Sequence, residues 1–98
     1  MAKSVQPVIE AFLNGKNKKI NNTKANNGKL YLFGNMIAKI DLKVGKIMIT
    51  TCRWNTPTTR DRLNMLPGIW ISSKKEQLFI RRDNTQNWET WDGNWIYI

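Results

Sequence analysis

Residues 50–71 read TTCRWNTPTTRDRLNMLPGIWI, which has the pattern of a strand, a turn, a short helix, a second turn and a second strand. A hydroxyl side chain at Thr58 or Thr59 fits a helix N-cap, and Asp61 suits the positive end of the helix dipole. The spacing of Leu63 and Leu66 predicts one inward face, and Pro67-Gly68 is typical of a helix end. We therefore expect a central helix over residues 58–66.

Strand-like segments lie on both sides of this helix. Before it, apolar residues in 30–33, 36–42 and 46–54 are separated by turn residues. After it, residues 69–73 and 77–82 form a predicted hairpin, and Asp92-Gly93 predicts a tight turn joining residues 88–91 to 94–98. The pattern predicts an α+β fold with an N-terminal helix, a three-stranded antiparallel meander, a central short helix and a second three-stranded antiparallel meander. The meanders would form one curved sheet or a small barrel, with Phe33, Ile49, Leu63 and Leu66 buried.

We expect one domain over residues 1–98, because the length allows a single core. Residues 1–15 predict an N-terminal helix whose apolar stripe (Val5, Val8, Ile9, Phe12, Leu13) covers this protein's own core rather than a partner. Residues 16–29 are rich in Lys and Asn and contain no acid, which indicates a loop or a mobile arm. Residues 30–98 would be the β-rich core, with the central helix at 58–66.

The charge is strongly positive and uneven. The net charge is +9; residues 83–98 contain three carboxylates and no Lys or Arg, so residues 1–82 carry +12. A basic surface of this kind favours a polyanion, most often nucleic acid. An acidic protein partner and simple solubility remain open as alternatives.

The residue types exclude most catalytic chemistry. The chain has no histidine and one cysteine, which removes the commonest general base, the usual triads and zinc sites of known type. No phosphate-binding glycine loop or calcium loop is present. We expect a protein that is not an enzyme and needs no metal or cofactor. Cys52 is predicted to be an inert thiol in a reducing compartment, and no segment predicts a membrane span or a signal peptide.

Three segments resemble a family of small, uncharacterised tailed-bacteriophage proteins. They are LYLFGNxIA at residues 30–38, TTRxRLNxLPG at 58–68 and WDGxWI at 91–96. The resemblance covers residues 28–98, leaves residues 1–27 outside, and supplies no catalytic residues. It implies a phage protein that acts in the host bacterial cytoplasm or in a virion.

The leading hypothesis is a small non-catalytic phage accessory protein that binds nucleic acid without sequence specificity. Phosphates would be neutralised by lysines and arginines, and one of the two nearby tryptophans 88 and 91 would be exposed and stack a base. The alternatives are an inhibitor that docks on an acidic host protein, such as a host or defence enzyme, and a minor virion component. The candidate binding residues are Lys16, Lys18, Lys19, Lys24, Arg60, Arg62, Arg81, Arg82, Trp88 and Trp91.

Overall fold

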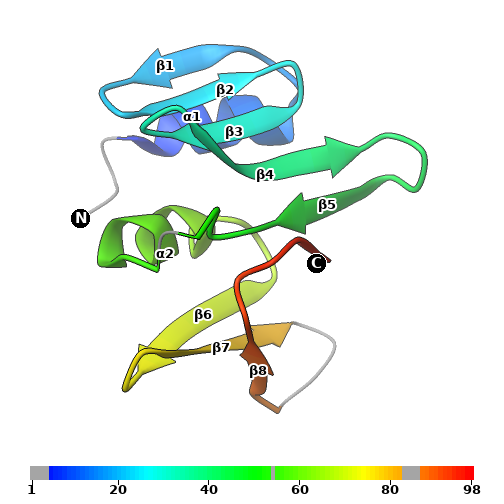
Figure 1. Ribbon diagram of the computed structural model, residues 1–98. Coiled ribbons are helices and arrows are strands. Elements are labelled where there is room, and N and C mark those ends of the chain that lie inside the picture. The colour runs from blue at the N-terminus through cyan, green and yellow to red at the C-terminus, as the bar shows by residue number, and fades with distance from the viewer. Residues whose placement is uncertain (1–4, 54, 83–86) are drawn as a thin grey trace.

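The computed structural model describes residues 5–53, 55–82 and 87–98, and in these it has two helices and nine strands. Figure 1 shows a larger sheet beside helix α1 and a smaller sheet beyond helix α2. In chain order the elements are α1 (Gln6–Leu13), β1 (Lys18–Ile20), β2 (Thr23–Asn26), β3 (Lys29–Leu32), β4 (Asn35–Asp41), β5 (Lys46–Ile49), α2 (Pro57–Leu63), β6 (Ile69–Lys74), β7 (Gln77–Arg82), β8 (Glu89–Trp91) and β9 (Ile96–Tyr97).

The strands form two antiparallel sheets. The larger sheet has six strands in the order β1-β2-β3-β4-β5-β9, and the smaller has three in the order β6-β7-β8. The predicted layout of two three-stranded meanders around a central helix is therefore wrong. The described strands form two separate sheets instead of the expected single curved sheet or small barrel.

The first correction concerns residues 16–29, which were predicted to be a loop or a mobile arm. They form β1, β2 and the start of β3, and helix α1 packs against all three strands. Thr23 and Ala25 point toward α1 and are buried, while Lys24 between them is exposed. Small side chains suit this position because the larger Ile9 and Phe12 of α1 fill the space above them. The scarcity of large apolar residues thus reflects close packing under a helix.

The second correction concerns the last strand. Strand β8 pairs with β7, as expected, but β9 crosses to the other sheet and pairs with β5. The Asp92-Gly93 segment is therefore a crossing between the sheets rather than a hairpin turn. The carbonyl of Gly93 accepts hydrogen bonds from Thr50 Oγ1 at 2.6 Å and from the Thr51 backbone N–H at 2.9 Å. A Cβ at Gly93 would collide with the Thr51 side chain, so this close approach requires glycine.

Helix α2 begins one residue before the expected start and ends at Leu63 instead of Leu66. Its N-cap is Thr56 rather than Thr58 or Thr59, and the Thr59 backbone N–H donates to Thr56 Oγ1 at 3.2 Å. Pro57 explains the shift, because proline is favoured in the first helical turn and lacks the N–H that a cap would have to satisfy. The third predicted strand is also shorter than expected. It ends at Ile49, while its predicted last residue, Trp54, lies outside the described residues.

One connected core joins the two sheets and both helices. Ile49, Leu63 and Leu66 belong to it, as predicted, together with Val8, Ile9 and Phe12 on the inner side of α1. Phe33 is the exception, because 69% of its side chain is exposed. The prediction that Phe33 is buried is wrong, since Phe33 lies in the turn between β3 and β4.

Candidate nucleic-acid interface

The larger sheet turns a basic, aromatic face away from α1. Side chains alternate along each strand, so the residues between the buried positions all lie on this outer face. Cross-strand pairs extend it from one strand to the next: Lys19 lies opposite Lys24, Lys24 opposite Tyr31, and Lys29 opposite Lys39. We call this surface the lysine face and define it by Lys19, Lys24, Lys29, Lys39 and Lys46 with Tyr31, Trp95 and Tyr97.

Two lysines of this face lie over aromatic rings. Lys24 Nζ is 5.1 Å from the centre of the Tyr31 ring, and Lys39 Nζ is 4.8 Å from that of Trp95. Both distances are in the range of cation–π attraction. The long side chains therefore lie along the sheet and keep their charges close to its aromatic surface.

The positive charge of the lysine face is largely uncompensated. In residues 5–53, 55–82 and 87–98, the ion pairs are Arg62–Asp61 and Arg82–Glu89, and neither involves a lysine. Asp41 lies on the same face, but its carboxylate accepts a hydrogen bond from the Tyr97 hydroxyl at 2.7 Å. This bond lowers the pKa of Asp41 and raises that of Tyr97. A polyanion would thus meet several lysines and one carboxylate that is already hydrogen-bonded.

The lysine face includes some of the predicted residues and adds others. Lys19 and Lys24 belong to it. Lys18 pairs with Ala25 and so lies on the opposite side of the sheet, and Lys16 precedes β1 in an exposed turn.

Sequence reasoning did not single out Lys39 and Lys46, which the sheet places on the lysine face. The signal was present, since each lysine alternates with apolar residues along a predicted or extended strand. This alternation does not show which lysines share one face of the sheet until the pairing of the strands is known.

The two predicted arginines of the central helix have internal partners. The Arg62 side chain is 12% exposed; its Nε donates to Thr23 Oγ1 at 2.9 Å, and its Nη1 contacts Asp61 Oδ2 at 2.8 Å. Arg62 therefore links α2 to β2. Arg60 hydrogen-bonds to the neighbouring Asn55 side chain. Arg62 Nη2 also donates to Asn22 Oδ1 at 3.4 Å, so all three nitrogens of this guanidinium have partners within the protein.

The smaller sheet has a different outer face. Trp70 lies opposite Arg81, and the Arg81 guanidinium carbon is 4.3 Å from the centre of the Trp70 ring and 5.9 Å from that of Trp88. We call this surface the tryptophan face and define it by Trp70, Phe79, Arg81 and Trp88.

The other predicted residues of the smaller sheet have internal contacts. Trp91 is buried, and its indole N–H donates to the Asn94 carbonyl at 2.9 Å. Trp88 is 49% exposed, in agreement with the expectation that one of the two is accessible. Arg82 lies 3.6 Å from Glu89, which offsets its charge.

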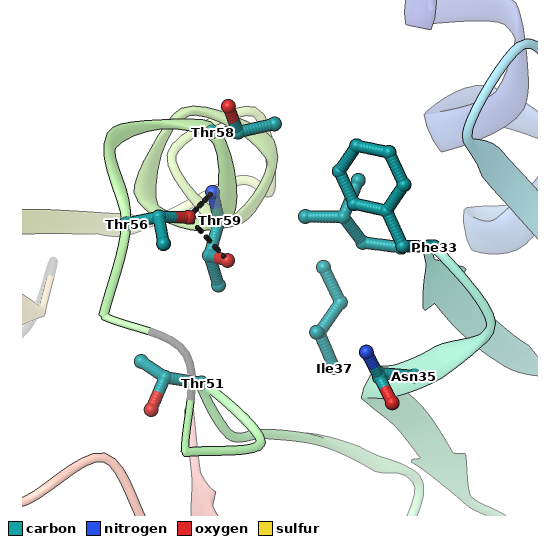
Figure 2. Close-up of a pocket in the computed structure, with 8 residues that line it drawn as sticks. Phe33, Asn35, Ile37, Thr51, Thr56, Thr58 and Thr59 are labelled. Carbon is teal, nitrogen blue, oxygen red and sulfur yellow. Dashed lines mark hydrogen bonds between the residues drawn. The ribbon is translucent and has the colours of Figure 1, made fainter.

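An apolar hollow of about 320 Å³ opens between the β3–β4 turn and the start of α2. Figure 2 shows Phe33 and Ile37 on one side and Thr56, Thr58 and Thr59 on the other. No group of three or more acidic, cysteine or histidine side chains in the described part of the chain is arranged to hold a metal ion. None of the described helices is long and apolar enough to cross a membrane.

The comparisons with known proteins give a family. No curated protein and no solved structure matches the chain. The family model described as "Kyanoviridae Gp96 protein" matches residues 1–97. This match includes residues 1–27, which the resemblance in the sequence left out. The chain therefore belongs to the Kyanoviridae Gp96 protein family, a family of phage proteins.

Proposed function

We propose that this phage protein is a small non-catalytic accessory protein that binds nucleic acid through the lysine face. The observation that carries the proposal is the gathering of five lysines and three aromatic rings on one open sheet face. The lysines would neutralise phosphates and release their counterions, which gives affinity without sequence specificity. The Tyr97 ring, which is exposed and has no lysine over it, would supply a stacking surface for a base. Such a protein would act in the bacterial cytoplasm, where phage and host nucleic acids are present.

The spacing of the charges supports the proposal. Two pairs lie directly opposite each other on neighbouring strands, about 4.8 Å apart: Lys19 with Lys24, and Lys29 with Lys39. The other neighbours on adjacent strands, Lys24 with Lys29 and Lys39 with Lys46, are offset by two residues and lie about 7–8 Å apart. A nucleic-acid backbone carries a charge at comparable intervals, because a phosphate occurs about every 3.4 Å per strand of a duplex and farther apart when a single strand is extended. Several phosphates can therefore be met at once without rearranging the sheet.

The test is the salt dependence of binding, measured by fluorescence anisotropy with a labelled oligonucleotide. Four or five phosphate contacts predict a log–log slope of roughly −3 to −4.5. Changing Lys19, Lys24 and Lys29 together to Ala should make the slope shallower by about 2 to 3. The matched control changes Lys16, Lys43 and Lys74 to Ala, which removes the same charge outside the lysine face. Equal losses for the two triple variants, or no binding by the wild-type protein at about 50 mM salt, would contradict the proposal.

A second candidate function is an inhibitor that docks on an acidic host protein. The tryptophan face favours it, because exposed Trp and Arg side chains are the commonest anchors of protein interfaces. Trp70 and Trp88 are exposed by 42% and 49%, and Arg81 lies between them. Lys74 and Lys75 are close by at the β6–β7 turn, so the surroundings are basic as well. Capture of one host protein in a nuclease-treated lysate, lost when Trp88 is changed to Ala, would support this function.

A further inference from the structure

Phe33 occupies a turn position that does not suit its side chain. Leu32 and Asn35 are paired, so Phe33 and Gly34 form a two-residue hairpin turn, with φ of 51° and 80°. Positive φ at both turn positions is the type I′ geometry, in which Asn-Gly is strongly preferred. A phenylalanine there has an unfavourable backbone conformation and exposes an apolar ring to water.

The same sheet contains a second turn of this geometry that has the preferred residues. Asn27 and Gly28 connect β2 to β3, with φ of 51° and 75°, and they are also flanked by a directly paired couple, Asn26 and Lys29. The two turns have nearly the same geometry, but one carries the preferred asparagine and the other an exposed ring. Lys75 and Glu76, in the turn between β6 and β7, also have positive φ, but both are polar; Phe33 differs in exposing an apolar ring. Strained positions of this kind are concentrated at functional sites.

Phe33 separates two hollows. On one side lies the apolar hollow of about 320 Å³ described above, which is within the size range of small-ligand sites. On the other side lies a hollow of about 230 Å³ lined by Lys19, Lys24 and Tyr31 of the lysine face. Phe33 lines both hollows. In the apolar hollow its ring lies opposite Thr58 and Thr59 of α2 (Figure 2).

We infer that Phe33 is a base-stacking platform and that the ligand of the lysine face is single-stranded nucleic acid. This inference rests on the proposed function and specifies its ligand. One base would stack on the Phe33 ring, at the entrance of the apolar hollow, beside Tyr31, whose ring is covered by Lys24. The phosphate next to this base would lie near Lys19 and Lys24.

Two polar side chains at the apolar hollow suit the edge of a base. Asn35 and Thr58 line this hollow, and neither side chain makes a hydrogen bond to another described residue. They offer both donors and acceptors to a base. A duplex cannot use these features, because its bases are paired and stacked on one another and their faces are closed to aromatic side chains.

The decisive variant is Phe33→Asn, which restores the preferred Asn-Gly turn while it removes the ring. It should keep or raise the melting temperature, so a loss of binding cannot be attributed to unfolding. The probes are a fluorescein-labelled oligo(dT) strand and a labelled DNA hairpin duplex of the same number of nucleotides. Stacking on one ring predicts that Phe33→Asn weakens oligo(dT) binding by roughly 5- to 150-fold and changes duplex binding by less than about twofold.

Two further variants complete the test. Phe33→Trp keeps an aromatic platform and should retain oligo(dT) binding. Leu42→Asn removes another highly exposed apolar side chain, in the β4–β5 loop away from both hollows, and should leave binding to both probes unchanged.

The outcomes separate the inference from the proposed function. Equal effects of Phe33→Asn on the two probes, no effect on either, or wild-type binding of the duplex as tight as that of oligo(dT) would overturn the single-strand inference. The proposed function would survive these results if the lysine-face triple variant still flattened the salt dependence. Loss of that lysine dependence would overturn the proposed function itself.

Discussion

The lysine face and the tryptophan face are the outer surfaces of two sheets that share one core, and they differ in how their cations are held. On the larger sheet, positive charge is spread over five lysines on flexible stems, none of them within ion-pair distance of a described carboxylate. On the smaller sheet, Arg81 lies against Trp70 and Trp88, and Arg82 is close to Glu89. Dispersed charge suits a repeating polyanion, whereas a compact aromatic and guanidinium cluster suits a single anchoring contact. We therefore expect the two faces to suit ligands of different chemistry.

The largest expected effect tests whether the two faces depend on one core. Leu66 is buried between the sheets, and Leu66→Ala should lower the free energy of unfolding by about 2–5 kcal/mol because it leaves a cavity. Urea melts followed by tryptophan fluorescence and by circular dichroism should show one coincident transition. Separate transitions for the two probes would mean that the sheets unfold independently.

The next effect tests whether the tryptophan face acts alone. Changing Trp70 and Trp88 together to Ala should weaken capture of a host protein by about 2 kcal/mol or more if these rings are interface anchors. Oligonucleotide affinity and its salt slope should remain those of the wild type, because neither ring lies on the lysine face. A large fall in oligonucleotide affinity would show that nucleic acid uses both faces.

A smaller effect concerns the helix that lies between the sheets. Thr56→Ala should destabilise the protein by about 0.5–2 kcal/mol, since the Thr59 N–H loses its cap acceptor. Thr58→Ala is the control, because the Thr58 side chain caps nothing among the described residues and lies in the first turn of α2. Thermal melts of both variants measure the difference. A larger loss of stability for Thr58→Ala than for Thr56→Ala would instead support Thr58 as the N-cap, as the sequence had suggested.

The smallest effect is a pH dependence specific to the lysine face. The Tyr97 hydroxyl lowers the pKa of Asp41, so this contribution to stability is complete above the ordinary value of 3.8 and is lost as pH falls through the lowered value. The pKa of Tyr97 is raised, so its contribution is complete below 10.0 and is lost as pH rises beyond that value. Tyr97→Phe should reduce both dependences in thermal melts over roughly pH 2–5 and roughly pH 9–11. Unchanged profiles would show that the hydrogen bond is absent in solution.

Much of the local structure was predictable. The N-terminal helix follows from the stripe of Val8, Ile9 and Phe12. The presence of the central helix was also predicted, but its N-cap is Thr56 and its last residue is Leu63. The hairpin of β6 and β7 and the hairpin of β3 and β4 were recognised from alternating apolar residues around short turns. These features depend on neighbours within a few positions, which is the information that local patterns contain.

Only some of the residues that form the lysine face could be identified from the sequence. Lys19 and Lys24 were identified from charge alone, but so were Lys18, which lies on the opposite side of the sheet, and Arg62, whose side chain binds Thr23 and Asp61. Charge patterns indicate which residues are cationic. They do not indicate which cations share a surface.

The sequence by itself determined the basic, histidine-free composition, the helical stripe of α1 and the position of most strands, because these depend on residue type and on short spacing. Only the tertiary structure decided that β9 joins β5, that residues 18–26 are strands, and that Phe33 is exposed. The physical reason is that alternation defines two faces of a strand without saying which face is covered or which strand lies beside it. Those choices are made by backbone hydrogen bonds between distant segments, such as the bonds from Thr50 and Thr51 to Gly93, and by the packing of α1 on its sheet.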